Sequence, residues 1–516
     1  MDKMTDLEMR DLIFRDLYNT GTGPDFKFGE LVKRFEERSW RYDPDLENDL
    51  IDEMYRLAEK CGIHYYKNGY YVFDGKIYVS VDMEILESTF KLWCTRMNLK
   101  IAQKRKKTIF KDEFMAHIRI ANHLQPRLDI VAFKNGVLDL NTYEFNPFSP
   151  DYHVTYYHPY RYDPKAKCRM WQAFLKEVLP DSTSRMILQM FLGLGLIERG
   201  TVYNRNEGRD GGKVELCLML VGAGANGKSV IYDTAMGIFG KSRISACDYG
   251  ELTMAGDEGM RARVMMRDAI FNWCPDTDSR TFGKKNTGVF KRIVSGEPVT
   301  DRKIGENVQN NYHMPYLIFN LNELPGIDEG TLGFIRRLQI VSFDVTIPHQ
   351  KQNKTLALDL KEEYPGIFNW VMRGMREVRR RKFLFPSCEK SYRQMLLMQL
   401  KMNPIVSWCN AYGIRCQAGA KGEQPTLVPT NVINDSVYAY CEDNDAAQLP
   451  TKQKIGNTLG YLHFEKKRVS SGYRYALYGV SVDDLKQSFV IQDHRFYDEV
   501  MEELDDEEET YIDDTD

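Results

Sequence analysis

The sequence predicts an α/β protein with a parallel-sheet core, an N-terminal α+β region and a C-terminal winged-helix-like region. Residues 205–345 alternate short apolar strands with helical segments, the pattern of a parallel sheet covered by helices. Residues 1–120 combine helical apolar spacing with hairpin signals, whereas residues 425–480 show two helical segments and then two β-rich runs broken at Ser470-Ser471-Gly472. A length of 516 residues with 43% apolar residues suffices for about three domains with their own cores.

Composition excludes several classes of protein. No apolar stretch approaches the roughly 18 to 20 residues of a transmembrane helix, and acids interrupt the N-terminus where a secretory signal is apolar. The ten cysteines show no CxxC pair and no Cys/His ligand spacing, which argues against a zinc site and a disulfide framework. We therefore expect a cytoplasmic protein with reduced, mostly buried thiols and no membrane partner.

The charge is distributed unevenly along the chain. The net charge is −4, but residues 493–516 contain thirteen acids and one base, so this segment carries −12 and residues 1–492 carry +8. A basic body is compatible with a polyanionic partner. The acidic segment is predicted to be disordered. It acts either as a solubility tail or as a DNA-mimicking or partner-docking tail, since Tyr497, Leu504, Tyr511 and Ile512 stand among the acids.

The N-terminal third carries helix and turn signals. Asn68-Gly69, Asp74-Gly75 and Asn135-Gly136 predict tight turns between strands. A basic run at 100–111 is either a solvated helix face or a nucleic-acid contact. Apolar residues at helical spacing predict three helices, at Leu12, Ile13 and Leu17, at Leu31 and Phe35, and at Leu50, Met54 and Leu57.

A glycine-rich loop follows the apolar strand 216–221 and precedes a helical pattern. Gly222, Gly227, Lys228 and Ser229 of GAGANGKS occupy the GxxxxGK[ST] positions of a phosphate-binding loop. The glycines let the backbone wrap a phosphate that the helix N-terminus attracts, Lys228 offsets the β- and γ-phosphate charge, and Ser229 binds Mg²⁺. The sequence thus predicts a site for ATP and Mg²⁺ that is built from consecutive residues: Gly222, Ala223, Gly224, Ala225, Asn226, Gly227, Lys228, Ser229 and Val230.

Such a site needs a second carboxylate on a neighbouring strand. In AIFNWCPDTDSR, a mostly apolar strand at 269–274 ends before Asp276 and Asp278. We expect one of them to order the metal with Ser229 and to polarise the attacking water, and we prefer Asp276. Because the strand contains Asn272 and no adjacent acid pair, an aspartate-rich surface turn is the alternative.

Two further positions fit catalysis. Asn322 follows the strand 316–321 and is placed to orient the lytic water, unless it only caps the turn before Pro325. Arg336 and Arg337 precede another strand and point to different faces. One can form a local salt bridge while the other reaches a neighbour's nucleotide as an arginine finger; an ordinary surface pair is the alternative.

With these motifs in order, the chain resembles superfamily 3 helicases of the phage and plasmid primase-helicase type, a group that includes the poxvirus primase-helicase. The resemblance covers roughly 130–480 and is carried by GAGANGKS, FKRIVSGEPVTDRK, NELP at 322–325 and FIRRLQIVSF. AFKNGVLDL and FNPFSP upstream, and EEYPGIFNWVMRGM downstream, resemble the flanking segments of that family. The resemblance implies an AAA+-like ATPase core, a hexameric ring with nucleotide between subunits, and 3′ to 5′ translocation on single-stranded nucleic acid.

The family's functional positions fall on particular residues here. Gly222 to Ser229 match Walker A, Asn322 matches the sensor asparagine, and Arg336 or Arg337 matches the arginine finger. The chain departs from the family at Walker B, where Asp276 or Asp278 stands in place of the usual acid.

The resemblance and the charge pattern also indicate surfaces for nucleic acid. Family rings contact DNA through a hairpin before the sensor strand, here 298–314, where Arg302 and Lys303 are placed to grip phosphates; a solvated β-turn is the alternative. In the winged-helix-like region Thr451 is expected to cap a helix that presents Lys452 and Lys454. The following wing offers four cations: Lys466, Lys467, Arg468 and Arg474. The winged-helix-like region is therefore expected either to bind DNA or to dock a protein.

These observations predict an ATP-dependent replicative DNA helicase of a phage, plasmid or other mobile element, located in the cytoplasm of its host. Its expected partners are single-stranded and forked DNA and further copies of itself in a homohexamer; a separate primase, polymerase or single-strand-binding protein is a further candidate. The alternative is a P-loop ATPase that acts as a replication initiator or DNA remodeller without processive unwinding. The predicted domains are an α+β domain (1–120), a helical or collar region (121–204), the helicase core (205–350), a helical linker or lid (351–415), a winged-helix-like domain (416–490) and the acidic tail (491–516).

Overall fold

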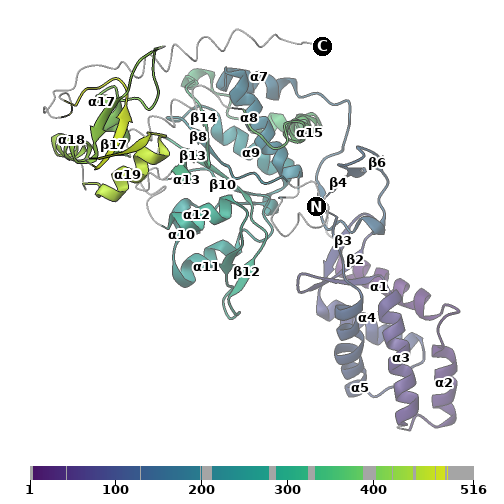
Figure 1. Cartoon of the computed structure of the whole chain (residues 1–516). Coiled ribbons are helices and arrows are strands. Elements are labelled where there is room, and N and C mark those ends of the chain that lie inside the picture. Colours follow the sequence, from purple (N-terminus) through teal and green to yellow (C-terminus); the bar gives the residue numbers. More distant parts are fainter. Residues whose placement is uncertain are drawn as a thin grey trace. The chain divides into compact units, whose positions relative to one another are not determined.

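The computed structural model of the protein describes residues 4–41, 43–127, 129–197, 199, 212–277, 286–323, 332–386, 403–420, 422–444, 449–470, 472–482 and 485 (Figure 1). The chain forms two compact parts. The first comprises residues 1–167, 196–198 and 364–369, and the second comprises residues 168–195, 199–363 and 370–516. Both contain helices and sheets, which confirms the prediction of a mixed α/β protein.

Three amphipathic helices begin the first part, as their apolar spacing predicts. α1 (Asp6–Gly21) starts with a capping box at Thr5, and α3 (Pro44–Lys60) starts after Asp43, whose carboxylate accepts two backbone hydrogen bonds. With α2 (Phe28–Glu37), their apolar faces share one core with α4 (Met83–Arg96), a π-helical turn (Ile109–Phe114) and α6 (Met115–Ala121). All the predicted apolar positions lie in this core except Leu12, which is packed at its edge.

The basic run forms α5 (Gln103–Thr108) and the start of the π-helical turn. Lys106 is buried, and Arg105 forms an ion pair with Glu47 of α3. At least these two cations therefore contribute to packing of the first part.

The three predicted turns connect strands. β1 (Ile63–Tyr66), β2 (Gly69–Phe73) and β3 (Tyr78–Val81) form an antiparallel sheet, with a turn at Lys67-Asn68, one residue before the predicted pair, and Asp74-Gly75 between β2 and β3. The positive φ angles of Lys67 (46°) and Asn68 (63°) fit a type I′ hairpin turn. A second sheet has the order β6-β5-β4-β7, with Lys134-Asn135 between β4 and β5 and Gly136 as the first residue of β5: β4 (Ile130–Phe133), β5 (Gly136–Asp139), β6 (Phe145–Asn146) and β7 (Tyr157–His158).

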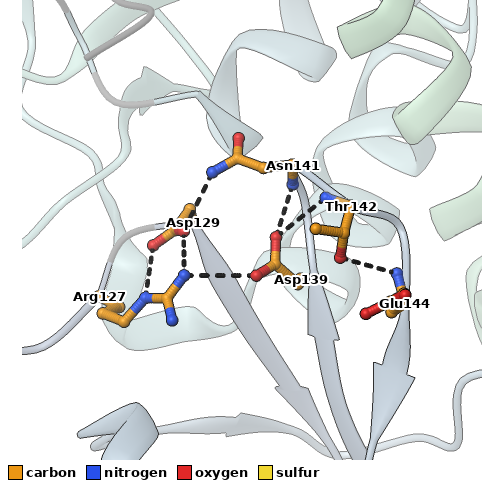
Figure 2. A network of polar contacts seen from close by, with 6 residues as sticks. All are labelled: Arg127, Asp129, Asp139, Asn141, Thr142 and Glu144. Carbon is orange, nitrogen blue, oxygen red and sulfur yellow. Dashed lines mark hydrogen bonds and ion pairs between the residues drawn. The ribbon is translucent and has the colours of Figure 1, made fainter. Parts of the chain in front are cut away.

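A polar network closes the open end of the β4–β5 hairpin (Figure 2). The Asp139 carboxylate accepts hydrogen bonds from the backbone N–H groups of Asn141 (2.8 Å) and Thr142 (3.2 Å). Arg127 donates to Asp129 (Nε–Oδ1 3.2 Å) and to Asp139 (Nη2–Oδ2 3.3 Å). Asp139, Asn141 and Thr142 thus order the turn between β5 and β6.

The second part contains a five-stranded parallel sheet in the order β14-β8-β13-β10-β9. The strand predicted at 316–321 has the same bounds in the structure, while those predicted at 216–221 and 269–274 start one and two residues later. The strands are β8 (Cys217–Val221), β9 (Ile244–Ser245), β10 (Phe271–Cys274), β13 (Tyr316–Leu321) and β14 (Leu338–Ser342).

Helices cover both faces of this sheet. On one face, Phe239 of α9 (Lys228–Phe239) packs against Phe271 of β10 at 5.2 Å between ring centroids, and Phe191 of α8 (Ser182–Gly193) packs against Tyr316 of β13 at 6.1 Å. On the other face, alternate strand residues share a core with helices α10 (Tyr249–Thr253), α12 (Thr287–Val294) and α13 (Leu332–Ile335). Within the sheet, the amide of Asn272 bonds both backbone groups of Cys247, which explains an asparagine inside a buried strand.

Two close contacts join segments of the second part that are distant in the sequence. α8 meets α15 (Tyr364–Arg380) so closely that a Cβ on Gly374 would lie 2.0 Å from the carbonyl oxygen of Gln189. Arg199 donates to the carbonyl oxygens of Met314 (3.2 Å) and Pro315 (2.5 Å). It also donates to the carbonyl of Val294, and burial lowers its pKa to about 10.

The C-terminal region, residues 403–485, begins with α17 (Pro404–Ala411). We expected helix, helix and two β-rich runs; the structure adds a strand before the helices, so the order is strand, helix, helix, strand, strand. The strands form an antiparallel sheet in the order β15-β17-β16. The elements are β15 (Thr426–Pro429), α18 (Thr430–Asp443), α19 (Lys452–Tyr461), β16 (Lys466–Val469) and β17 (Gly472–Leu477).

Among the described cysteines, none forms a disulfide and all except Cys416 are buried. No described residues form a group of three or more His, Cys, Asp or Glu side chains suited to a metal. Within the same described ranges, no helix is long and apolar enough to span a bilayer. The predicted acidic tail, residues 491–516, lies outside the described residues.

Candidate nucleotide site

The glycine-rich loop, Gly222–Gly227, connects the buried strand β8 to helix α9, as the sequence predicts. Gly227 has a φ of +84°, and a Cβ there would lie 2.8 Å from the Phe174 ring. A Cβ on Gly222 would lie 2.3 Å from Asn226 Nδ2 and 2.5 Å from the Phe343 carbonyl oxygen. The loop therefore requires glycine at both positions, for close approach at each and for backbone conformation at Gly227.

Lys228 is the first residue of α9 and lies within the curve of this loop. Only 7% of it is exposed, and its ammonium donates to the Gly222 carbonyl. Burial lowers the pKa of Lys228, while the negative charge of Asp276 acts in the opposite direction. Lys228 and Asp276, predicted from separate motifs, therefore interact electrostatically. Ser229 and Ala223 are exposed, and Val230 is half-buried.

The parallel sheet brings the three predicted motifs to one edge. β13 lies between β8 and β10, with Leu321 opposite Val221 and Phe319 opposite Cys274. Because all strands point the same way, Gly222, Asn322 and Asp276 follow the carboxyl ends of adjacent strands. Ligands of open parallel sheets bind at this edge.

Of the two predicted aspartates, Asp276 is exposed just beyond β10, and Asp278 lies outside the described residues. The backbone carbonyl of Asp276 accepts from the Cys274 thiol at 3.2 Å. The next residue, Thr277, donates its backbone N–H to the Asn320 carbonyl at 3.0 Å. These bonds tie the turn after β10 to β13 and leave the Asp276 side chain at the sheet edge.

Asn322 is exposed at the end of β13, whereas Asn320, which we did not predict as a site residue, is 2% exposed. Asn320 accepts a hydrogen bond from the Trp273 indole at 3.0 Å. Within the described ranges, no hydrogen-bond acceptor is paired with the buried Nδ2 of Asn320 or of Asn226. Buried donors without acceptors are costly, so both amides suit an anionic or polar group at this edge.

The donor set of this edge fits a nucleotide phosphate with Mg²⁺. The ammonium of Lys228 and the amides at the start of α9 suit phosphate oxygens. The hydroxyl of Ser229 and the carboxylate of Asp276 are oxygen ligands, which Mg²⁺ prefers, and Mg²⁺ usually takes only one or two protein carboxylates beside substrate phosphates.

The two adjacent arginines have different environments. Arg337 is largely buried and donates to Ser295 Oγ (Nη2–Oγ 3.1 Å), with Glu215 at 3.7 Å. The Arg336 side chain is 66% exposed and its nearest carboxylate, that of Glu215, lies 3.6 Å away. Arg337 is therefore held within its own chain, and Arg336 is the one that faces solvent.

The segment 298–314 forms the expected hairpin from β11 (Val299–Asp301) and β12 (Gln309–Asn311). Lys303 and Ile304 at its tip are 52% and 83% exposed, and Arg302 is half-buried with Asp257 at 3.7 Å. The base of the hairpin is held by Arg267, whose guanidinium contacts the fully buried Asp301 through two hydrogen bonds of 2.9 and 2.6 Å.

The predicted cations of the C-terminal region lie on α19 and on the β16–β17 hairpin. Thr451 caps α19 by accepting from the Lys454 backbone N–H at 3.2 Å, which confirms the predicted cap, and Lys452 is also exposed. On β16, Arg468 is exposed and Lys467 forms an ion pair with Glu465 at 3.1 Å.

Comparisons with known proteins bear on this arrangement. Residues 30–180 match the "D5 N terminal like" domain family. A protein of Acanthamoeba polyphaga mimivirus, named "Putative helicase L207/L206", is 25% identical over 256 residues, which make up 48% of this chain and 25% of that protein. The chain thus spans about a quarter of its relative's length. These sequence matches confirm the resemblance to the phage and viral primase-helicase type.

A comparison with solved structures matched two apo structures of the NrS-1 C-terminal region. One has a TM-score of 0.43 and 10% identity over 82% of this chain and 98% of that chain. The other has a TM-score of 0.45 and 11% identity over 83% and 99% of the two chains.

Proposed function

We propose that the chain is an ATP-dependent DNA helicase with a P-loop core of the AAA+ type. The observation that carries this proposal is the order β8-β13-β10 of the parallel sheet, which places Lys228 and Asp276 after strands on either side of the one that leads to Asn322. A phosphate-binding lysine, a carboxylate and a polar residue on adjacent strands are the parts that phosphoryl transfer to water requires.

In this proposal the chain's own residues divide the work. The amides of Gly222–Val230 and the Lys228 ammonium bind the β- and γ-phosphates, and the buried amides of Asn226 and Asn320 find acceptors among the polar groups of the site. Ser229 and Asp276 hold Mg²⁺, which neutralises charge on the phosphates when it is bound. Asn322 orients the attacking water.

We further propose that the active form is a homohexameric ring that translocates 3′ to 5′ on single-stranded DNA. Arg336 rather than Arg337 acts as the arginine finger, because Arg337 already binds Ser295 in its own chain, whereas Arg336 is exposed. Arg302 and Lys303 contact the DNA backbone from the β11–β12 hairpin, which Arg267 anchors through Asp301.

The test compares Lys228→Ala with Lys241→Ala, an exposed lysine beyond the far end of the same helix. We expect Lys228→Ala to lower DNA-stimulated ATP hydrolysis on the order of 100-fold and to abolish unwinding of a 3′-tailed duplex, while Lys241→Ala retains both. Strand separation that persists in Lys228→Ala would contradict the proposal. A chain that hydrolyses ATP at full rate as a strict monomer would contradict the shared site.

The second candidate is a replication initiator or DNA remodeller that uses the same ATPase site. It is favoured by the C-terminal order β15-α18-α19-β16-β17, which suits a winged helix with basic residues on its second helix and its hairpin. Binding to blunt duplex with ATP turnover but without displacement of a tailed strand would favour this candidate.

A further inference from the structure

A surface cavity of about 480 Å³ lies in the C-terminal region, between the start of α18 and the β16–β17 hairpin. Two of its lining residues are cations and none is an acid; the others supply a hydroxyl, an amide, a phenol ring and a proline ring. The lining residues are Pro429, Thr430, Asn431, Lys466, Tyr473 and Arg474. This composition suits an anionic ligand that also carries apolar groups.

The positive charge at the cavity is held in place by aromatic rings. The Lys466 ammonium lies 4.7 Å from the centroid of the Tyr473 ring and 5.5 Å from that of Tyr475. Tyr475 is buried, whereas Tyr473 is 53% exposed and offers a free ring surface beside the charge. Lys467 lies opposite Arg474 in the register of the two strands and forms an ion pair with Glu465 at 3.1 Å.

The chain itself supplies a ligand of matching chemistry. Leu485 is 4% exposed and belongs to the same apolar core as Tyr475, so the chain continues towards its acidic segment from the region that holds the cavity. Asp493, the first acid of the segment that carries −12, is the eighth residue after Leu485. Eight residues span at most about 28 Å. A region of about 80 residues has a radius of gyration of about 12 Å, so the acids can reach the cavity.

We propose that the acidic segment 493–516 binds in this cavity and along the β16–β17 hairpin of its own chain, where it competes with nucleic acid for the same cations. Acidic side chains meet Lys466 and Arg474, and one of the segment's apolar residues packs on Tyr473. Attachment to the same region raises the effective concentration of the segment to the order of millimolar, so weak contacts suffice. Docking is independent of the proposed helicase activity, whereas competition with DNA rests on it.

The test uses a fluorescent peptide of residues 493–516 and the chain that lacks them, and its readout is anisotropy without nucleotide or DNA. We expect the shortened chain to bind the peptide at about 50 mM salt and to lose it at about 500 mM, because salt screens exposed charges. The double variant Lys466→Glu, Arg474→Glu should weaken binding at least tenfold. The matched control Lys33→Glu, on an exposed site of α2, should not weaken it.

Each remaining outcome decides the proposal. The full chain should bind the peptide at least tenfold more weakly than the shortened chain, because its own segment occupies the cavity; equal binding overturns intramolecular docking and favours capture by another copy. Equal peptide binding by the double variant and the control overturns the cavity as the site, provided that circular dichroism shows both folded. Removal of 493–516 should raise affinity for an oligo-dT several-fold, and unchanged affinity overturns the competition. Peptide binding should be the same in Lys228→Ala, which loses ATPase activity, as in the unmodified protein. The docking proposal and the helicase proposal can therefore fail separately.

Discussion

The β11–β12 hairpin depends on one buried ion pair, and its removal gives a sharp prediction. Asp301 has no exposed surface, and its two carboxylate oxygens accept from Nε and Nη2 of Arg267 at 2.9 and 2.6 Å. This pairing also raises the pKa of Arg267 above its ordinary value. Arg267→Met keeps much of the side-chain volume but leaves the Asp301 carboxylate buried without its partner.

The expected cost of Arg267→Met is about 3–5 kcal/mol, the range for a buried pair that loses one member. The hairpin can escape part of this cost by opening and exposing Asp301 to water, so the loss is limited by the free energy of local opening. We therefore expect two signs: lower stability of the second part to urea, and faster amide hydrogen exchange in β11 and β12 than elsewhere in that part.

The assay includes two comparisons. Arg261→Met removes an exposed arginine from α11 (Gly256–Val264), the helix that ends just before Arg267, and should change stability by less than about 0.5 kcal/mol. Arg267→Met with Asp301→Leu removes both charges and should recover most of the loss, because no uncompensated charge remains. If Arg267→Met unfolds at the urea concentration of the unmodified chain with full protection of β11 and β12, the reasoning is wrong.

Three other perturbations have defined outcomes. Arg336→Ala should lower ATPase activity of the assembled protein at least tenfold without changing its urea midpoint, because this side chain is 66% exposed; unchanged turnover would exclude it as the finger. Gly374→Ala should destabilise the chain by about 2 kcal/mol in urea unfolding, because its Cβ meets the Gln189 carbonyl oxygen at 2.0 Å. Hydrogen bonds from Arg380 lower the pKa of Glu377 from 4.5 to about 2. The contribution of Glu377 to the free energy of unfolding is therefore complete above pH 4.5 and is lost as the pH falls through about 2. Glu377→Gln should therefore cost about 1 kcal/mol at pH 7, after solvent screening, and progressively less below pH 4.5.

Local pattern was sufficient for much of the fold. Asn68-Gly69 predicted a turn because asparagine and glycine accept positive φ, and a turn forms one residue earlier, with Lys67 and Asn68 at its two central positions. The strand 316–321 and the loop from Gly222 were predictable because a buried strand, a glycine-rich loop and a helix leave consecutive signals in the chain. The short strand β15 was missed, since its four residues pair only with β17, about fifty positions later.

The candidate site was predictable in its members but not in their arrangement. The motifs named Lys228, Asp276 and Asn322 separately, and only the order β8-β13-β10 brings them to one edge. Asn320 was missed because a single polar residue inside an apolar strand forms no motif. The signal that could have found it is the asparagine itself, because a polar side chain in a buried strand needs a hydrogen-bond partner. Asn272, which weakened the sequence argument for its strand, proved to accept a hydrogen bond from Ser245 of β9 and to bond both backbone groups of Cys247, two residues further on.

The sequence alone determined that a phosphate-binding loop, a following carboxylate and a sensor-like asparagine are present, because each depends on residues that are neighbours in the chain. The tertiary structure decided which of two adjacent arginines faces solvent, how Arg267 holds a hairpin through Asp301, and where Arg199 is buried. These choices depend on partners that are distant in the sequence, as for Arg199 and Met314, which lie 115 residues apart. Burial and hydrogen bonding between such distant residues arise only when the whole core packs, so no local pattern records them.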